Sequence, residues 1–315
     1  MLKNKLKNYY SSYGIIVILA LEVLFFSLLS ENFFTLANLM SVARQLSFVG
    51  IAAVGVTFLI ISGGIDISTG SNEAFTGVFC CLLMVNFGFP MWLAIIISLV
   101  IGLLIGTING IFCVRLGLSP LISTLAMQSI LKGAAYLITN AQPIYGIPDS
   151  FKFLGQGYIF GVIPVPLIVM IVCFIFGYWV LNMTYIGRYF YAVGGNVEAA
   201  RLSGINPRVV MLLAFGSSAL FASIAGVLMA GRLGSGQPSI GVGFEMDVIT
   251  AIVLGGVSIN GGSGNIIGVF IGTLIMGILS NGMLMIGLSD YWQWVVKGLV
   301  LVAAVSISNV TKNSD

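Results

Sequence analysis

Two glycine-rich segments hold the residue types that could line a polar path through apolar surroundings. Residues 63–71 include Asp66 and are followed by Glu73, and residues 255–263 repeat their glycine pattern. Interrupted helices expose backbone groups, which membrane proteins tolerate where they line a cavity. The repeat therefore favours a translocation pathway, while two ordinary turns in a chain with 40 glycines are the alternative. The identical positions are Gly63, Gly64, Gly70 and Ser71 in the first segment and Gly255, Gly256, Gly262 and Ser263 in the second.

The acidic residues of the first segment have two interpretations. A carboxylate inside a bilayer is costly and normally faces a bundle interior or water, which would place Asp66 and Glu73 on the pathway. If the turn lies at the surface instead, both are simply solvated or capping residues, and Asp66, which precedes Ser68 and Ser71, would cap the third span. Both interpretations remain open from the sequence.

The composition indicates that these segments lie in a membrane protein. Hydrophobic residues make up 58% of the chain and charged residues 7%, and residues 74–114 and 248–289 contain no charge. A soluble domain of 315 residues needs more polar surface than this. The basic N-terminus before the apolar run 13–29 resembles a signal peptide, but the run is long and lacks a small-residue cleavage pattern. We therefore expect a retained first span.

The predicted fold class is all-α: a polytopic transmembrane helix bundle with about ten spans and two glycine-interrupted half-motifs. The whole chain, 1–315, forms a single transmembrane domain. A helix needs roughly 20 apolar residues to cross the hydrocarbon core, and the eighth segment is shorter. The predicted spans are 13–30, 43–62, 72–87, 91–114, 119–139, 163–182, 208–230, 245–257, 265–287 and 292–310.

The distribution of Lys and Arg predicts the orientation. With the N-terminus inside, the cytoplasmic side receives eight basic residues and the opposite side three, so both termini are predicted to be cytoplasmic. The eight are Lys3, Lys5, Lys7, Arg115, Arg188, Arg201, Arg208 and Lys312, and the three are Arg44, Lys152 and Arg232.

One polar loop, residues 187–208, has a structure of its own. Asn196 is suited to cap a helix over Val197–Leu202, Glu198 falls in the first turn, and Gly204 can close it with a positive φ. Such a short helix could dock into a groove of another protein. A basic loop that only sets topology is the alternative.

The sequence lacks the residue types that several functional classes require. The chain has no histidine and no nucleophile–base set, so an enzyme is disfavoured and no catalytic residue is assigned. It has no metal-ligand spacing and no Gly-x-x-x-x-Gly-Lys-Ser/Thr loop, so ATP would be bound elsewhere. The sequence contains no basic patch that would suggest nucleic-acid binding. A stand-alone secondary transporter or channel is the second hypothesis, although its only candidate carboxylates, Asp66 and Glu73, are adjacent instead of forming a relay.

At these residues the chain resembles the permease subunits of bacterial ATP-binding-cassette sugar importers of the ribose, galactose and xylose type. The resemblance covers nearly the whole chain. The matching stretches are 32–35, 62–71, 187–204, 243–249, 253–256, 261–264, 291–294 and 297–298.

The resemblance implies roles for three groups of residues. The loop would be the coupling helix that contacts a cytoplasmic ATPase, and the glycine-rich segments would line the pathway. The acids Glu245 and Asp247 would form an outer gate or contact a binding protein; plain solvated loop acids are the alternative. The coupling residues are Gly187, Arg188, Gly194, Gly195, Asn196, Glu198, Ala199, Ala200, Arg201, Ser203 and Gly204. The pathway residues are Gly63, Gly64, Asp66, Ser68, Gly70, Ser71, Glu73, Gly255, Gly256, Ser258, Asn260, Gly262 and Ser263.

The resemblance also implies partners. These are an ATPase with two nucleotide-binding domains that holds ATP and Mg, a second permease copy of the same or a different sequence, and an extracytoplasmic sugar-binding protein. The chain would reside in the bacterial inner membrane and bind no cofactor itself. Similar proteins usually have apolar or small residues at Asn72 and Glu73, so the exact solute stays open between a monosaccharide, a nucleoside and a furanosyl signalling molecule.

Overall fold

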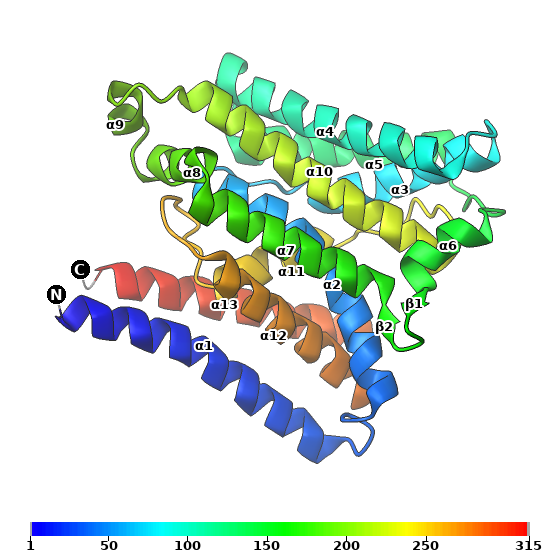
Figure 1. Cartoon of the computed structure of the whole chain (residues 1–315), viewed down its shortest axis with the longest axis horizontal. Helices are drawn as coiled ribbons and strands as arrows, with labels where there is room; N and C mark the ends of the chain where they lie inside the picture. The colour runs from blue at the N-terminus through cyan, green and yellow to red at the C-terminus, as the bar shows by residue number, and fades with distance from the viewer. Residues whose placement is uncertain (1, 314–315) are drawn as a thin grey trace.

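Helices of very different length make up most of this chain in the computed structural model (Figure 1), which describes the backbone of residues 2–313 and the side chains of residues 14–306. Within the described residues, the only β-structure is an antiparallel hairpin of two strands, each two residues long, and one isolated β-bridge. The elements are α1 (Leu2–Leu29), α2 (Leu36–Ile61), α3 (Thr69–Val85), α4 (Met91–Leu116), α5 (Pro120–Thr139), α6 (Asp149–Gln156), β1 (Tyr158–Ile159), β2 (Ile163–Pro164), α7 (Val165–Met183), α8 (Tyr185–Gly195), α9 (Val197–Leu202), α10 (Pro207–Leu233), α11 (Phe244–Leu254), α12 (Ile266–Met285) and α13 (Asp290–Asn313).

Every predicted span has a helix at its place. Six helices in the described part of the chain are long and apolar enough to cross a membrane: α2, α4, α5, α7, α10 and α12. α3 has 17 residues and α11 has 11, below the usual spanning length. The polytopic all-α architecture is therefore confirmed in outline, while the count of ten crossings stays a prediction.

α1 begins and α13 ends on the side of the bundle where α8 and α9 lie, and α6 with the hairpin forms the opposite end (Figure 1). At that opposite end, Arg44 donates to the carbonyl of Gln156 over 3.0 Å, and Gln156 donates to the carbonyl of Arg232 over 2.9 Å. All three basic residues assigned to one side, Arg44, Lys152 and Arg232, thus lie at that end, because Lys152 belongs to α6 itself. The side chains of Lys3, Lys5, Lys7 and Lys312 lie outside the described residues.

α2 and α10 form the centre of the bundle. In α2, 83% of the most apolar stretch is buried, whereas the corresponding share in α4 and α5 is 28%. Helix association in lipid depends on close packing, which small residues permit. A Cβ on Gly106 of α4 would collide with the carbonyl oxygen of Phe215 on α10, and one on Gly226 of α10 with that of Glu73 on α3. Glycines thus set the helix spacing in the core.

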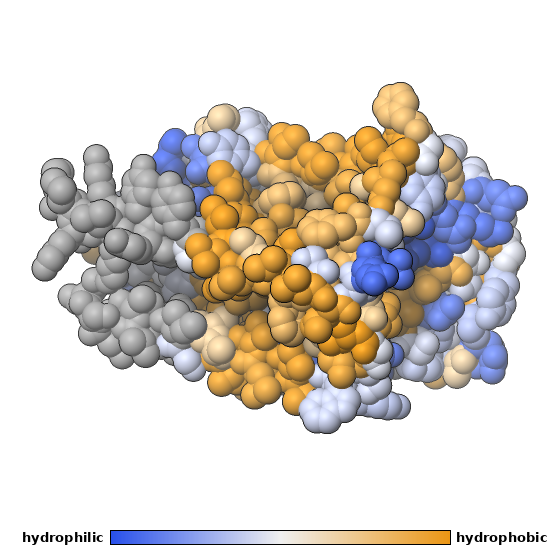
Figure 2. Space-filling model, turned by 90° about the horizontal axis from the view of Figure 1, so that it is seen from below, coloured by the Kyte–Doolittle hydropathy of each residue, from blue (hydrophilic) through white to orange (hydrophobic). Residues whose placement is uncertain are grey.

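The outer surface is apolar over a broad band. Figure 2 shows hydrophobic residues across the middle of one face, with hydrophilic residues gathered toward one end. Large exposed hydrophobic residues include Val100 and Leu104 on α4, Leu137 on α5 and Val172 on α7. A surface of this kind is typical of contact with lipid.

The segment between α5 and α7 contains more structure than the sequence predicted, because it forms α6 and the β1–β2 hairpin instead of a plain loop. Phe151 of α6 is fully buried, and Gly155 packs so closely on α10 that a Cβ would collide with the backbone of Arg232. α6 therefore covers the end of α10 and fixes the hairpin end of the bundle.

Candidate translocation and coupling site

The two glycine-rich segments meet. The amide of Gly262 donates to the carbonyl of Ile61, just before Gly63, over 2.8 Å. Gly63, Gly261 and Gly262 have φ values of +88°, +82° and +73°, a backbone region that side chains with a Cβ rarely adopt. A Cβ on Gly261 would lie 3.0 Å from the backbone of Gly63. The repeated pattern therefore marks two segments that pack backbone against backbone.

The end of α8 lies on this junction. A Cβ on Gly194 would collide with the carbonyl oxygen of Ile61 and with the amide of Gly262, so only glycine fits there. The hydroxyl of Tyr191, also on α8, donates to the carbonyl of Gly264 over 3.0 Å. Gly195 differs, because a Cβ there would meet open space. The predicted coupling loop is thus in direct contact with both predicted pathway segments.

The short helix predicted from the sequence is present as α9, with the predicted bounds Val197–Leu202. Asn196 caps it by accepting a hydrogen bond from the amide of Ala199 over 3.0 Å, and Gly204 follows with a φ of +82°. Ala200 is buried against the rest of the molecule, whereas the apolar side chain of Leu202 is 88% exposed. α9 therefore stands at the bundle surface with an uncovered apolar side chain.

Most of the predicted coupling residues are accessible. Beside α9 lies an open groove of about 550 Å³, lined by Val197, Glu198, Arg201 and residues 204–208. Gly187 and Ala200 are buried and Gly194 is partly buried, so these three hold the loop in place. The exposed members are Arg188, Gly195, Asn196, Glu198, Ala199, Arg201, Ser203 and Gly204.

The predicted pathway residues divide into a buried and an exposed set. The exposed members gather at the turns where the two segments meet and are Gly63, Gly256, Asn260 and Ser263. Gly262 is partly buried. The buried members are Gly64, Asp66, Ser68, Gly70, Ser71, Glu73, Gly255 and Ser258.

Asp66 is the centre of a buried polar network. It is 1% exposed, one carboxylate oxygen accepts from the amide and the hydroxyl of Ser68, and the other accepts from the hydroxyl of Ser218 over 2.7 Å. Ser68 in turn accepts from Asn109 of α4, and Asn109 accepts from Ser123 of α5. The interpretation of Asp66 as a solvated surface residue is wrong. Its bonds to Ser68 stabilise the start of α3, and its bond to Ser218 attaches that start to α10.

α11 is a half-helix that begins inside the bundle. The segment before it runs along α3 from Cys81, which Gly236 contacts, to Gly70, which Gly241 contacts. Eleven residues of helix extend only about 16 Å, roughly half of the hydrocarbon core. Glu245 in its first turn is 8% exposed and accepts from Gln128 of α5 over 3.2 Å. The interpretation of Glu245 as a solvated loop acid is wrong.

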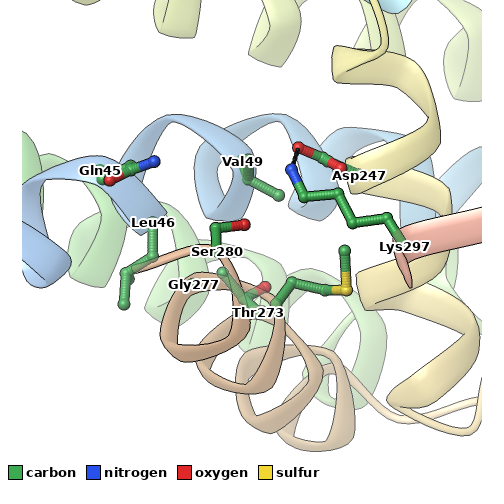
Figure 3. A pocket seen from close by; sticks show the side chains of 9 residues that line it. Gln45, Leu46, Val49, Asp247, Thr273, Gly277, Ser280 and Lys297 are labelled. Atoms are coloured by element: carbon green, nitrogen blue, oxygen red, sulfur yellow. Dashed lines mark hydrogen bonds and ion pairs between the residues drawn. The ribbon is translucent and has the colours of Figure 1, made fainter. Parts of the chain in front are cut away.

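Asp247 of α11 forms an ion pair with Lys297 of α13, with 2.7 Å between Oδ2 and Nζ. Figure 3 shows the pair beside a cavity to which Gln45 of α2 and Thr273 and Ser280 of α12 turn polar groups. The cavity measures about 50 Å³, which suits a few water molecules and is too small for a monosaccharide. Lys297 carries a charge within the predicted span 292–310, and intramembrane charges normally have partners. This charge was the sequence signal that could have identified Lys297 as a member of the site.

The site is made of hydrogen-bonding groups and close backbone contacts. Among the described residues, no group of three or more His, Cys, Asp and Glu side chains comes together in a way that could hold a metal ion. The arrangement is suited to transmitting movement, since α9, α8 and the two glycine-rich junction segments are in continuous contact. Ser218, Asn109 and Gln128 belong to it although they have no distinctive sequence pattern.

Comparisons of the sequence with known proteins identify relatives that are transport components. Residues 38–305 match the family described as branched-chain amino acid transport system / permease component. The ribose import permease of Haemophilus influenzae is 37% identical, covering 98% of both chains. The ribose import permease of Escherichia coli is 40% identical over 90% of this chain and 89% of its own length. The L-arabinose transport system permease of E. coli is 38% identical over 94% and 90%. No solved structure matches.

Proposed function

The chain belongs to the family described as branched-chain amino acid transport system / permease component, and from this premise we propose that it is the membrane-spanning subunit of an ATP-binding-cassette importer for a simple sugar. The observation that carries the proposal is the near full-length similarity to two ribose import permeases and an L-arabinose permease. The resemblance found in the sequence is thereby confirmed. The substrate is a monosaccharide such as ribose, and the chain acts as a transport subunit, not as an enzyme.

The power for import comes from a separate ATPase with two nucleotide-binding domains, which binds ATP and Mg and docks on α9. Support comes from the exposed apolar side chain of Leu202, the adjacent groove and the capped, well-defined helix between them. An extracytoplasmic binding protein delivers the sugar at the α6–hairpin end. A second permease subunit, a copy of this chain or a different permease, completes the path.

The contacts of α8 suggest how docking reaches the membrane. Gly194 touches both Ile61 at the end of α2 and Gly262 in the turn between α11 and α12, so a displacement of α8 moves the end of α2 and this turn together. Small shifts of packed helices are a common way to switch between two states. Opening of the Gly63–Ser71 and Gly255–Ser263 segments would then expose Asp66, Ser68, Asn260 and neighbouring groups to a sugar.

The gate at the other side of the path is assigned to Glu245 and Asp247. The ion pair of Asp247 with Lys297 ties α11 to α13, and the hydrogen bond of Glu245 with Gln128 ties α11 to α5. Together these contacts hold the half-helix in its present position, and the cavity beside Lys297 is closed to a sugar.

The protein is placed in the bacterial inner membrane with both termini and α9 on the cytoplasmic side. The bundle has both terminal helices and α9 at the same end (Figure 1), and Arg188, Arg201 and Arg208 belong to that end, as expected for a cytoplasmic face. Labelling of single cysteines placed in α9 with a membrane-impermeant reagent in intact cells checks this orientation. Labelling from outside would show that α9 lies on the exterior and that the proposed orientation is wrong.

Reconstitution tests the proposed function. The chain is placed in proteoliposomes with an ATPase subunit and a solute-binding protein from the same organism, and uptake of radiolabelled ribose, arabinose, leucine and a nucleoside is compared. We expect ATP-dependent uptake of a sugar and none by the chain alone. Uptake without the ATPase would indicate a secondary transporter, and uptake of leucine alone would indicate the amino-acid branch of the family.

A further inference from the structure

Two buried carboxylates in the bundle have an oxygen without a partner. Glu73 of α3 is 1% exposed, and its Oε1 has no hydrogen-bond partner among the described residues. Glu245 of α11 is 8% exposed; its Oε1 accepts from Gln128, while its Oε2 has no partner within the same part of the chain. A buried acceptor left without a donor is expensive, and inside a membrane water does not readily supply one.

The two side chains converge on the same turn of α3. A Cβ on Gly70 would lie 2.5 Å from Oε2 of Glu245, so that oxygen sits directly over Gly70. Glu73 is three residues further along the same helix face, and helical side chains tilt toward the preceding turn, which here is the turn of Gly70. Both carboxylates are thus placed at the first turns of α3, Glu245 by its contact with Gly70 and Glu73 by its position one turn further along.

The charged groups around this space do not neutralise the pair. Lys297 is paired with Asp247, and Asp66 is satisfied by Ser68 and Ser218. Lys132 of α5 acts on Glu245 but is exposed. α4 has titratable groups only near its C-terminal end, Cys113 and Arg115, and the stretch of α10 that packs on α3, residues 218–230, has none.

We propose that Glu73 and Glu245 form a proton-binding site in which one proton, held on Glu73, is donated to Oε2 of Glu245. Two carboxylates that face each other in a low-dielectric interior cannot both ionise, and a single shared proton satisfies both free oxygens. Glu245 keeps the negative charge because Gln128 donates to it and Lys132 lies nearby. Glu73 has no such donor and is the member that holds the proton.

The site couples proton occupancy to the position of α11. With the proton bound, a hydrogen bond to an ionised acceptor joins α3 to the half-helix, and such bonds are about twice as strong as neutral ones. Alkaline pH removes the proton and places two negative charges across the same junction. Proton release therefore loosens the contact between α3 and the first turn of α11, and this consequence does not depend on which solute is carried.

Infrared spectroscopy on the full chain in lipid nanodiscs tests the site, independently of transport. A protonated carboxyl gives a carbonyl stretching band that shifts in deuterated water. We expect this band at neutral pH in the wild type and its loss in Glu73→Gln. In Glu245→Gln the band should remain but move to higher frequency, because the strong ionised acceptor has gone.

Two controls make the result decisive. Asp66→Asn removes a buried carboxylate that already has its donors, and it should leave the Glu73 band unchanged. Exchange of potassium chloride for sodium chloride at equal ionic strength should also leave it unchanged. A wild-type spectrum identical to that of Glu73→Gln, a band that does not move in Glu245→Gln, or displacement of the band by sodium would each overturn the proposal. Size-exclusion profiles confirm that the variants fold.

Discussion

Lys297 near the start of the last helix lies 2.7 Å from Asp247 on the half-helix α11, and both side chains are mostly shielded, with exposed fractions of 17% and 23%. The pair joins segments that are 50 residues apart in the sequence. Two charges at this depth are costly singly and acceptable together. The contact therefore holds α11, whose C-terminal end leads into the junction beneath α8.

The first prediction concerns this ion pair. Lys297→Met leaves Asp247 as an uncompensated shielded charge, so we expect a loss of about 3 kcal/mol in the free energy of unfolding. The double variant Lys297→Asp with Asp247→Lys restores opposite charges and should recover at least half of that loss. Thermal unfolding of the purified chain in nanodiscs measures both. If the double variant is as unstable as the two single changes combined, the pair has no stabilising role.

The second prediction compares two adjacent glycines at the end of α8. Gly194→Ala puts a methyl group against the carbonyl of Ile61 and the amide of Gly262, and overpacking of this kind costs about 1–3 kcal/mol. Gly195→Ala places the same methyl group in open space and serves as the matched control. We expect reduced ATP-dependent uptake and reduced thermal stability only in Gly194→Ala. Equal behaviour of the two variants would contradict the role of Gly194 as the contact between α8 and the junction.

The sequence was sufficient for features that depend on local chemistry. Asn196, Glu198 and Gly204 predict the bounds of α9, because a cap, a favourable charge and a left-handed residue act within a few positions. The glycine pattern located the two segments at the junction. Neither their mutual contact nor that of Gly194 could be read from the chain, since these pairings depend on how distant helices pack.

The missed features depend on tertiary structure. α6 and the hairpin lie in a short stretch with several turn residues and weak periodicity, and the burial of Phe151 against α10 is what stabilises them. Glu245 follows a glycine-rich stretch that the predicted topology placed on the outer side, so a solvated loop acid was one interpretation. That stretch instead runs back into the bundle along α3, which brings Glu245 within hydrogen-bonding distance of Gln128.

The third prediction concerns the network around Asp66. Ser218→Ala removes the donor to one carboxylate oxygen, and leaving a buried charged acceptor unsatisfied costs about 1–3 kcal/mol. Its neighbour Ser217 donates only to a carbonyl of its own helix, so Ser217→Ala should change stability by less than about 0.5 kcal/mol. Asp66→Asn keeps the size of the side chain, and we expect altered uptake kinetics at normal expression. Unchanged kinetics would assign Asp66 to helix stabilisation alone.

The fourth prediction locates the ATPase contact with a pair of exposed apolar residues at opposite ends of the bundle. Leu202 on α9 is 88% exposed and Phe160 in the hairpin turn is 91% exposed. Truncating an apolar anchor in a docked interface typically costs at least about 1–2 kcal/mol, or roughly a tenfold or larger loss of affinity. We therefore expect Leu202→Ser to weaken co-purification of the ATPase at least about tenfold, and Phe160→Ser to leave it unchanged, because Phe160 lies at the far end.

Glu198→Arg reverses a charge on the same exposed helix and should also weaken co-purification without reducing expression, since Glu198 is exposed and lines the open groove. Both α9 variants should keep the thermal stability of the wild-type chain, because surface changes without buried partners usually alter stability by less than about 0.5 kcal/mol. If the Leu202→Ser variant and the Glu198→Arg variant both bind the ATPase normally, the docking surface lies elsewhere. Weakened binding by Phe160→Ser would place it at the hairpin end, and the proposed orientation would then be reversed.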